Sequence, residues 1–87
     1  MPVVFIPAPL RGLTGGAAEV AVEGLTVAEA LDALDQRYPG LKDRVCRGET
    51  LAPGLQVAVD QTMTRQGLRA PLRPESEVHI LPAIGGG

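Results

Sequence analysis

Aromatic residues are almost missing from the chain, which has one Phe, one Tyr and no Trp among its 87 residues. A folded core must therefore be aliphatic, and aromatic platforms for stacking nucleic-acid bases are absent. Lys and Arg together number 8 against 10 Asp and Glu, and the basic residues are scattered singly. This distribution lacks the basic patch that nucleic acids require, so we expect no nucleic-acid partner.

Cysteine and histidine are equally scarce, because Cys46 and His79 are the single examples of each. One cysteine excludes an internal disulfide and indicates a reduced thiol in a cytoplasmic protein. Two such residues do not make a metal-binding cluster, so no metal is expected. Neither a signal segment nor a membrane-spanning apolar run is evident, which favours a cytoplasmic protein without a membrane partner.

The apolar residues that are present, 45% of the chain, indicate one small packed domain. Residues 3–6 are β-branched and aromatic, which is typical of a short strand. Residues 11–16 read as a turn, and residues 17–23 then alternate, with Val20 and Val22 on the inner face. The two strands should form a hairpin.

A helix is predicted to begin at Thr26, because Thr26 and Glu29 fit a capping box. In that motif the Thr26 hydroxyl accepts from the Glu29 N–H, and the Glu29 carboxylate accepts from the Thr26 N–H. Residues 39–40, Pro-Gly, end the helix, and residues 41–45 add one more turn. Apolar residues recur at spacings of three and four, as one buried face requires: Val27, Ala30, Leu31, Leu34 and Tyr38.

The second half of the chain predicts further strands. A loop over 48–54 leads to the clearest strand, 55–60, and a turn follows it. Residues 64–73 are polar and broken by Gly and Pro, which favours a short edge strand and loop. The last strand, 77–81, places Val78 and Ile80 in the core and turns its other side chains outward.

Three glycines follow this strand: Gly85, Gly86 and Gly87. Glycine loses more conformational freedom on ordering than any other residue, so they add nothing to stability. One interpretation is a frayed or artificially added terminus. The other is a thin, flexible strip that threads a narrow channel and presents its carboxylate to another protein. We expect a domain over 1–84 and a flexible tail over 85–87.

The β-β-α-β-β order with a terminal Gly-Gly resembles the ubiquitin-like β-grasp proteins, and among them the MoaD/ThiS sulfur carriers. The resemblance implies an α+β fold, a mixed sheet of four to five strands packed on one main helix. Residues 78–87 have the family's closing strand, Pro and glycines, and residues 59–62 look like its turn, with Asp60 where Asn is more usual. Residues 6–16 look most like the CysO-type carriers of cysteine biosynthesis, although Gly85 stands where such carriers often have Ala.

The resemblance implies that the Gly87 carboxylate is adenylated with ATP by a ubiquitin-activating-type enzyme, similar to MoeB or ThiF. Sulfur then replaces AMP to give a thiocarboxylate. The implied acceptor is cysteine synthase or the molybdopterin synthase large subunit, and a JAMM-type metalloprotease is a further implied partner. The chain would be a protein substrate, not an enzyme, with no catalytic residues and no permanently bound cofactor.

Three residues are candidates for a partner-docking patch. His79 and Leu81 point away from the core, and Phe5 joins them if the first strand turns it to the same face. Scattered exposed apolar residues are also ordinary on protein surfaces. Cys46, placed in a loop, is either an inert thiol or a relay that passes persulfide sulfur to the tail.

Two other functions suit the same sequence. A ubiquitin-like modifier would join its Gly87 to lysines of target proteins, but Lys42 is the one lysine from which side-chain-linked polymers would grow. A passive β-grasp interaction module is the other alternative, and it gives the glycines no purpose.

Overall fold

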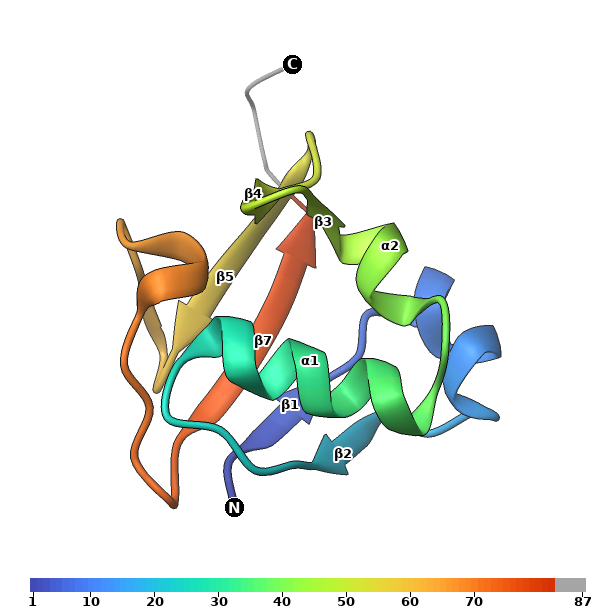
Figure 1. Ribbon diagram of the computed structural model, residues 1–87, viewed down its shortest axis with the longest axis horizontal. Coiled ribbons are helices and arrows are strands. Elements are labelled where there is room, and N and C mark those ends of the chain that lie inside the picture. The colour runs from blue at the N-terminus through green and yellow to red at the C-terminus, as the bar shows by residue number, and fades with distance from the viewer. Residues whose placement is uncertain (83–87) are drawn as a thin grey trace.

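The computed structural model describes residues 1–82. Its strands and helices follow the chain in this order (Figure 1): β1 (Val3–Phe5), the 3-10 helix η1 (Ala8–Thr14), β2 (Glu19–Ala21), α1 (Val27–Arg37), α2 (Leu41–Val45), β3 (Cys46–Arg47), β4 (Thr50–Leu51), β5 (Leu55–Val59), β6 (Thr62–Met63), the 3-10 helix η2 (Gly67–Arg69) and β7 (Glu77–Pro82).

Five of the strands form one mixed sheet in the order β2-β1-β7-β5-β6. β1 pairs in parallel with β7, and the other neighbours are antiparallel. α1 crosses one face of this sheet, and β3 and β4 form a small separate hairpin (Figure 1). The predicted α+β fold, a mixed sheet packed on one main helix, is confirmed.

At the start of α1, one of the two hydrogen bonds of the predicted capping box is present. The Thr26 hydroxyl accepts from the Glu29 N–H at 3.2 Å, as expected. The Glu29 carboxylate, however, accepts from the Leu25 N–H at 3.0 Å and not from Thr26. The backbone here is set by a second contact, because the Val27 N–H donates to the Ala70 carbonyl at 3.0 Å. The helix start is therefore fixed by a distant segment as well as by its own cap.

The core lies between α1 and the sheet. Val20, Val22, Val78 and Ile80 are buried as predicted. The segment 64–73, predicted as an edge strand and loop, also enters the core through η2 and the residues after it. Its buried side chains are Leu68, Ala70 and Leu72. The prediction was wrong there because alternate apolar residues in a polar segment pack against α1 without forming a ladder.

Three local predictions also needed correction. The predicted turn over residues 11–16 is mostly part of η1, which spans Ala8–Thr14 and begins with a proline in its first turn, a position that suits proline. The expected loop 48–54 contains β4, which pairs with β3. The edge strand is β6 at Thr62–Met63, which precedes the segment 64–73 where it was predicted. The reason is that the hairpin turn needs two residues, Asp60 and Gln61, with φ of 51° and 72°.

Gly24 allows the chain to pass close to α1. A Cβ at this position would lie 2.6 Å from the backbone nitrogen of Ala30 and 2.9 Å from its Cα. Both are backbone atoms of a helix, so neither moves aside easily.

We expect Gly24→Ala to lower the free energy of unfolding by about 1–3 kcal/mol, the usual cost of overpacking. Urea denaturation followed by circular dichroism measures this. Gly12→Ala is the matched control, because a Cβ on Gly12 meets no atom within 4 Å. Equal stability of the two variants would contradict the close approach.

Asp60 holds the start of β7 against the end of β5. Its carboxylate accepts from the Glu77 N–H at 2.9 Å and from the Ser76 hydroxyl at 3.0 Å, and Arg73 lies 3.4 Å away. These contacts lower the pKa of Asp60 below its ordinary value of 3.8. The hydrogen bond from the Glu77 N–H is the largest cause, and among the other favourable contacts Ser76 comes before Arg73. The charged form is therefore favoured in the folded state.

A carboxyl whose pKa is lowered by folding stabilises the protein above its unfolded pKa and loses this contribution as the pH falls through the folded pKa. We therefore expect Asp60→Asn to lower the free energy of unfolding at neutral pH. The difference from the unchanged protein should shrink below pH 3.8. Urea denaturation from about pH 6 to about pH 2 measures it. A pH-independent effect of Asp60→Asn would refute the assignment.

Candidate functional site

The predicted reactive residues Gly85, Gly86 and Gly87 lie outside the described residues. What the structure describes is the strand that precedes them. β7 lies in the middle of the sheet, between β1 and β5, and ends at Pro82. Its pairing with β5 extends from Val59 and Val78 to Leu55 and Pro82. The last described residue is therefore held in a ladder and is not at a loose end.

The predicted docking residues come from two neighbouring strands. Phe5 on β1 is the register partner of His79 on β7. Their rings stack, with centroids 4.2 Å apart and planes 4° from parallel. Both are half-buried, and the His79 Nε2 lies 3.4 Å from a carboxylate oxygen of Glu77. Leu81 is 38% exposed, two residues further along β7.

These three residues line one shallow hollow of about 530 Å³, named here the sheet-face hollow. Pro7, Pro9 and Pro82 also line it, so it lies beside the point where β7 ends. The structure thus brings together the three residues of the predicted patch. It also adds the two prolines near the start of η1, for which the sequence carried no signal.

Arg11 lines the same hollow but has a local structural partner. Its Nε donates to the Ile6 carbonyl at 3.0 Å, which ties η1 to the end of β1. The backbone carbonyl of Arg11 also accepts from the Thr14 hydroxyl at 3.1 Å. These contacts shape the rim of the hollow.

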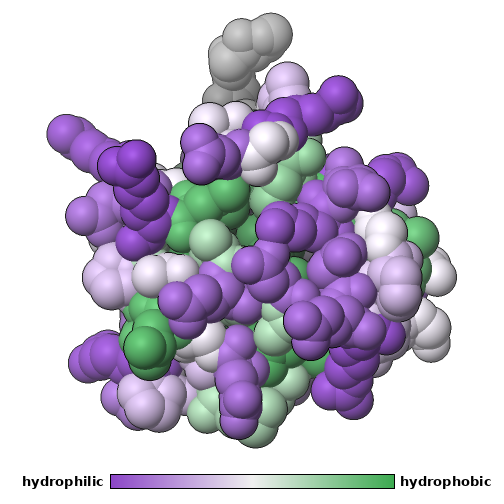
Figure 2. Space-filling model, in the orientation of Figure 1, coloured by the Kyte–Doolittle hydropathy of each residue, from purple (hydrophilic) through white to green (hydrophobic). Residues whose placement is uncertain are grey.

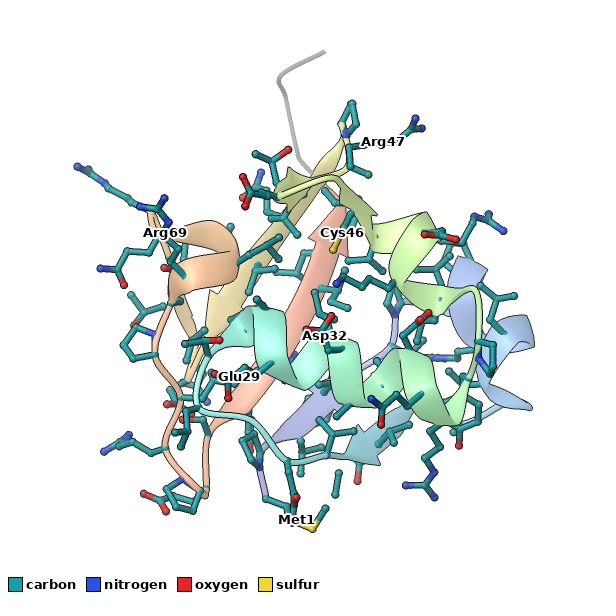
Figure 3. All side chains as sticks on the ribbon, viewed as in Figure 1. Met1, Glu29, Asp32, Cys46, Arg47 and Arg69 are labelled. Atoms are coloured by element: carbon teal, nitrogen blue, oxygen red, sulfur yellow. The ribbon has the colours of Figure 1, made fainter. Side chains whose placement is uncertain are left out.

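The sequence analysis placed Cys46 in a loop, and this prediction was wrong. It is the first residue of β3, directly after α2 (Figure 3), and it is buried within the core cluster. Burial is the main cause of a raised pKa for its thiol. Because the thiolate is the reactive form, both effects make Cys46 a poor nucleophile in the folded protein.

Two acidic residues of α1 contact the start of α2 and the residue before it. Asp32 forms an ion pair with Lys42 of α2. The Asp35 carboxylate accepts from the N–H groups of Gly40 and Lys42, at 3.1 and 3.0 Å. The hydrogen bond with Asp32 is the main cause of a raised pKa for Lys42. These contacts fix α2 against α1.

Two negative findings apply to residues 1–82. No group of three or more Cys, His, Asp or Glu side chains is placed there to hold a metal ion. None of the helices in this part of the chain is long and apolar enough to cross a membrane. Figure 2 shows that the α1 face of the molecule carries many hydrophilic side chains, with hydrophobic residues visible between them.

The mixed sheet with α1 across it defines the ubiquitin-like β-grasp class. Residues 4–87 match the model of the ThiS family, and the chain belongs to that family. The sulfur carrier protein CysO of Mycobacterium tuberculosis is 30% identical over 91 residues, covering 97% of this chain and 96% of the relative. The resemblance to the MoaD/ThiS carriers is thereby confirmed.

Solved structures give the same result. A chain in the crystal structure of the Amycolatopsis orientalis BexX/CysO complex is 36% identical, with a TM-score of 0.90 and full coverage of both chains. The small archaeal modifier protein 1 of Methanosarcina acetivorans is 27% identical, with a TM-score of 0.79, covering 99% of this chain and 95% of that one. Similarity therefore extends to both a carrier and a modifier.

Proposed function

We propose that this chain is a sulfur carrier that delivers sulfur as a C-terminal thiocarboxylate on Gly87. The observation that carries the proposal is the family match, which spans residues 4–87 and so includes the glycines. The similarity to CysO carriers over nearly the whole chain supports it. The central position of β7 supports it too, because in the sequence the glycines begin three residues after a strand that is paired on both edges.

The chemistry needs an activation step, because a carboxylate is a poor electrophile. A carboxylate oxygen of Gly87 attacks the α-phosphorus of ATP and displaces pyrophosphate, which gives an acyl-adenylate. Hydrosulfide then attacks the acyl carbon, AMP leaves, and loss of a proton gives the thiocarboxylate. If a persulfide supplies the sulfur, an acyl disulfide forms first, and a thiol reductant must cleave it. Both steps take place on partner enzymes, so the chain itself acts as their substrate.

Cysteine biosynthesis is the proposed destination of the sulfur. The relatives named sulfur carrier protein CysO support this choice over molybdopterin synthesis. The partners would be a MoeB- or ThiF-like adenylating enzyme that uses ATP, and a cysteine synthase that accepts the sulfur. A JAMM-type metalloprotease would release the carrier if the product stays attached to it.

The sheet-face hollow is proposed to dock the adenylating enzyme. It combines the stacked Phe5 and His79 with the exposed Leu81, and it borders Pro82. An enzyme that receives the residues after Pro82 must cover this end of the sheet. Half-buried rings with fixed positions suit such a contact, because they bury apolar area at little cost in conformational entropy.

Protein modification is the second candidate function, favoured by the similarity to small archaeal modifier protein 1. One observation restricts its scope. Lys42, from which lysine-linked polymers would grow, is paired with Asp32, and its pKa is raised. A charged, paired ammonium is a poor acyl acceptor. Lysine-linked polymers of this sequence would therefore have to form at a side chain that is already paired.

Deletion of Gly86 and Gly87 should abolish activation, because the new C-terminal carboxylate no longer reaches the α-phosphate of ATP in the enzyme. ATP–pyrophosphate exchange with the cognate adenylating enzyme measures this.

Intact mass spectrometry of the protein from its native host should show replacement of one oxygen by sulfur at the C-terminus. Gly87 remnants on lysines of other proteins would support the modifier instead. Undiminished exchange after the deletion would refute both functions.

Leu81→Glu should reduce kcat/KM for adenylation at least about tenfold, because it places a charge in an apolar contact. Leu25→Glu is the matched control, since Leu25 is 72% exposed and does not line the sheet-face hollow. Circular dichroism should show both variants folded. Equal kcat/KM values for the two would show that the enzyme docks elsewhere.

A further inference from the structure

A second hollow adjoins the sheet-face hollow at Pro82, which lines both of them. Its volume is about 310 Å³, and it is named here the exit groove. It joins the start of η1, the end of α2, β3 and the turn before β5. The residues that define it for the present argument are Pro7, Pro9, Arg44, Arg47, Pro53 and Pro82.

The exit groove is apolar with a positive rim. Arg44 and Arg47 are both exposed, and no Asp or Glu lines the groove. Within residues 1–82 neither arginine takes part in an ion pair. The chain as a whole carries a net charge of −2, so this concentration of positive charge departs from the average of the molecule. A ligand that fits is apolar with a carboxylate.

The two hollows share three prolines in their linings. Pro7, Pro9 and Pro82 line both of them. Arg47 lies at the end of the molecule toward which the β7 arrow points (Figure 3), whereas Arg69 lies at its side, on η2. A protein seated on the sheet-face hollow beside Pro82 would therefore lie next to the exit groove at these shared prolines.

The reacting group gives the adenylating enzyme little to recognise. A glycine carboxylate is chemically the same as the end of many other polypeptides. Its discrimination must come from the folded surface around the last strand. A thiocarboxylate, in contrast, is distinguished by its own reactivity. The enzyme that activates the carboxylate thus has the stronger need for a charged, shaped surface near Pro82.

We propose that the exit groove binds an apolar segment of the adenylating enzyme that bears an Asp or Glu side chain. Arg44 and Arg47 pair with that carboxylate, and the prolines contact its apolar neighbours. This proposal rests on the proposed function, because it assigns a second contact to the same partner. Arginine suits this role since its planar fork can donate two parallel hydrogen bonds to a carboxylate.

The test is ATP–pyrophosphate exchange with the full chain and its cognate adenylating enzyme. The double variant Arg44→Glu, Arg47→Glu should raise KM for the carrier at least about tenfold and leave kcat nearly unchanged, since binding and not chemistry is weakened. Arg44→Gln, Arg47→Gln should have a smaller effect in the same direction. Raising the salt concentration should weaken binding of the unchanged protein more than that of the charge-reversed variant.

The matched control is Arg65→Glu, Arg69→Glu, which makes the same change of charge at exposed arginines that line neither hollow. Its KM should stay within about twofold of the unchanged protein. An equal rise in KM for both double variants would show a general effect of charge and overturn the proposal. If the unchanged protein is not adenylated at all, the proposed function fails instead.

Two other occupants of the groove are distinguished by the same set of proteins. If the chain's own residues 83–87 bind there, charge reversal should lower KM by releasing them, and this result would overturn the proposal. If a second copy of the chain binds there, sedimentation velocity should show a dimer that the charge-reversed variant loses. A monomer whose KM rises as described supports the enzyme.

Discussion

The parallel pairing of β1 with β7 joins the two ends of the chain in the middle of the sheet. Val4 and Val78 are register partners in this pairing, and both are fully buried. β7 also carries β5 on its other edge, so the β1–β2 and β5–β6 hairpins belong to one sheet only through it. Parallel strands need a long connection, and here that connection includes α1 and most of the core. The base of the glycine tail is thus formed only when the whole domain is folded.

Local patterns in the sequence were sufficient for the elements that bury one regular face. The alternation of Val20 and Val22 predicted β2, and the three- and four-residue spacing through Leu31 and Leu34 predicted α1. The last strand was found for the same reason. In these segments the side chains that face the core repeat with the period of the backbone, so the pattern in the sequence is itself the record of burial.

The predictions that failed depend on contacts between distant segments. Leu68, Ala70 and Leu72 are buried because their segment packs beside α1, and its polar composition concealed this. Cys46 appeared to lie in a loop because β3 is two residues long, which is too short for periodicity to detect. The placement of Phe5 against His79 depends on the parallel register. The arginines of the exit groove are brought to Pro82 by α2, which carries Arg44, and by β3, which carries Arg47. No motif in the sequence marks either arrangement.

The direction of β7 also determines how the domain responds to force. Under the proposed function, an enzyme that draws the chain into its active site would pull on Pro82 along the axis of this strand. β7 is hydrogen-bonded along both edges, to β1 and to β5, so the load acts along the ladders and stretches many bonds together. An edge strand pulled from its end would instead lose its bonds one after another. The position of β7 should therefore make the domain resist unfolding when it is pulled through the end of this strand.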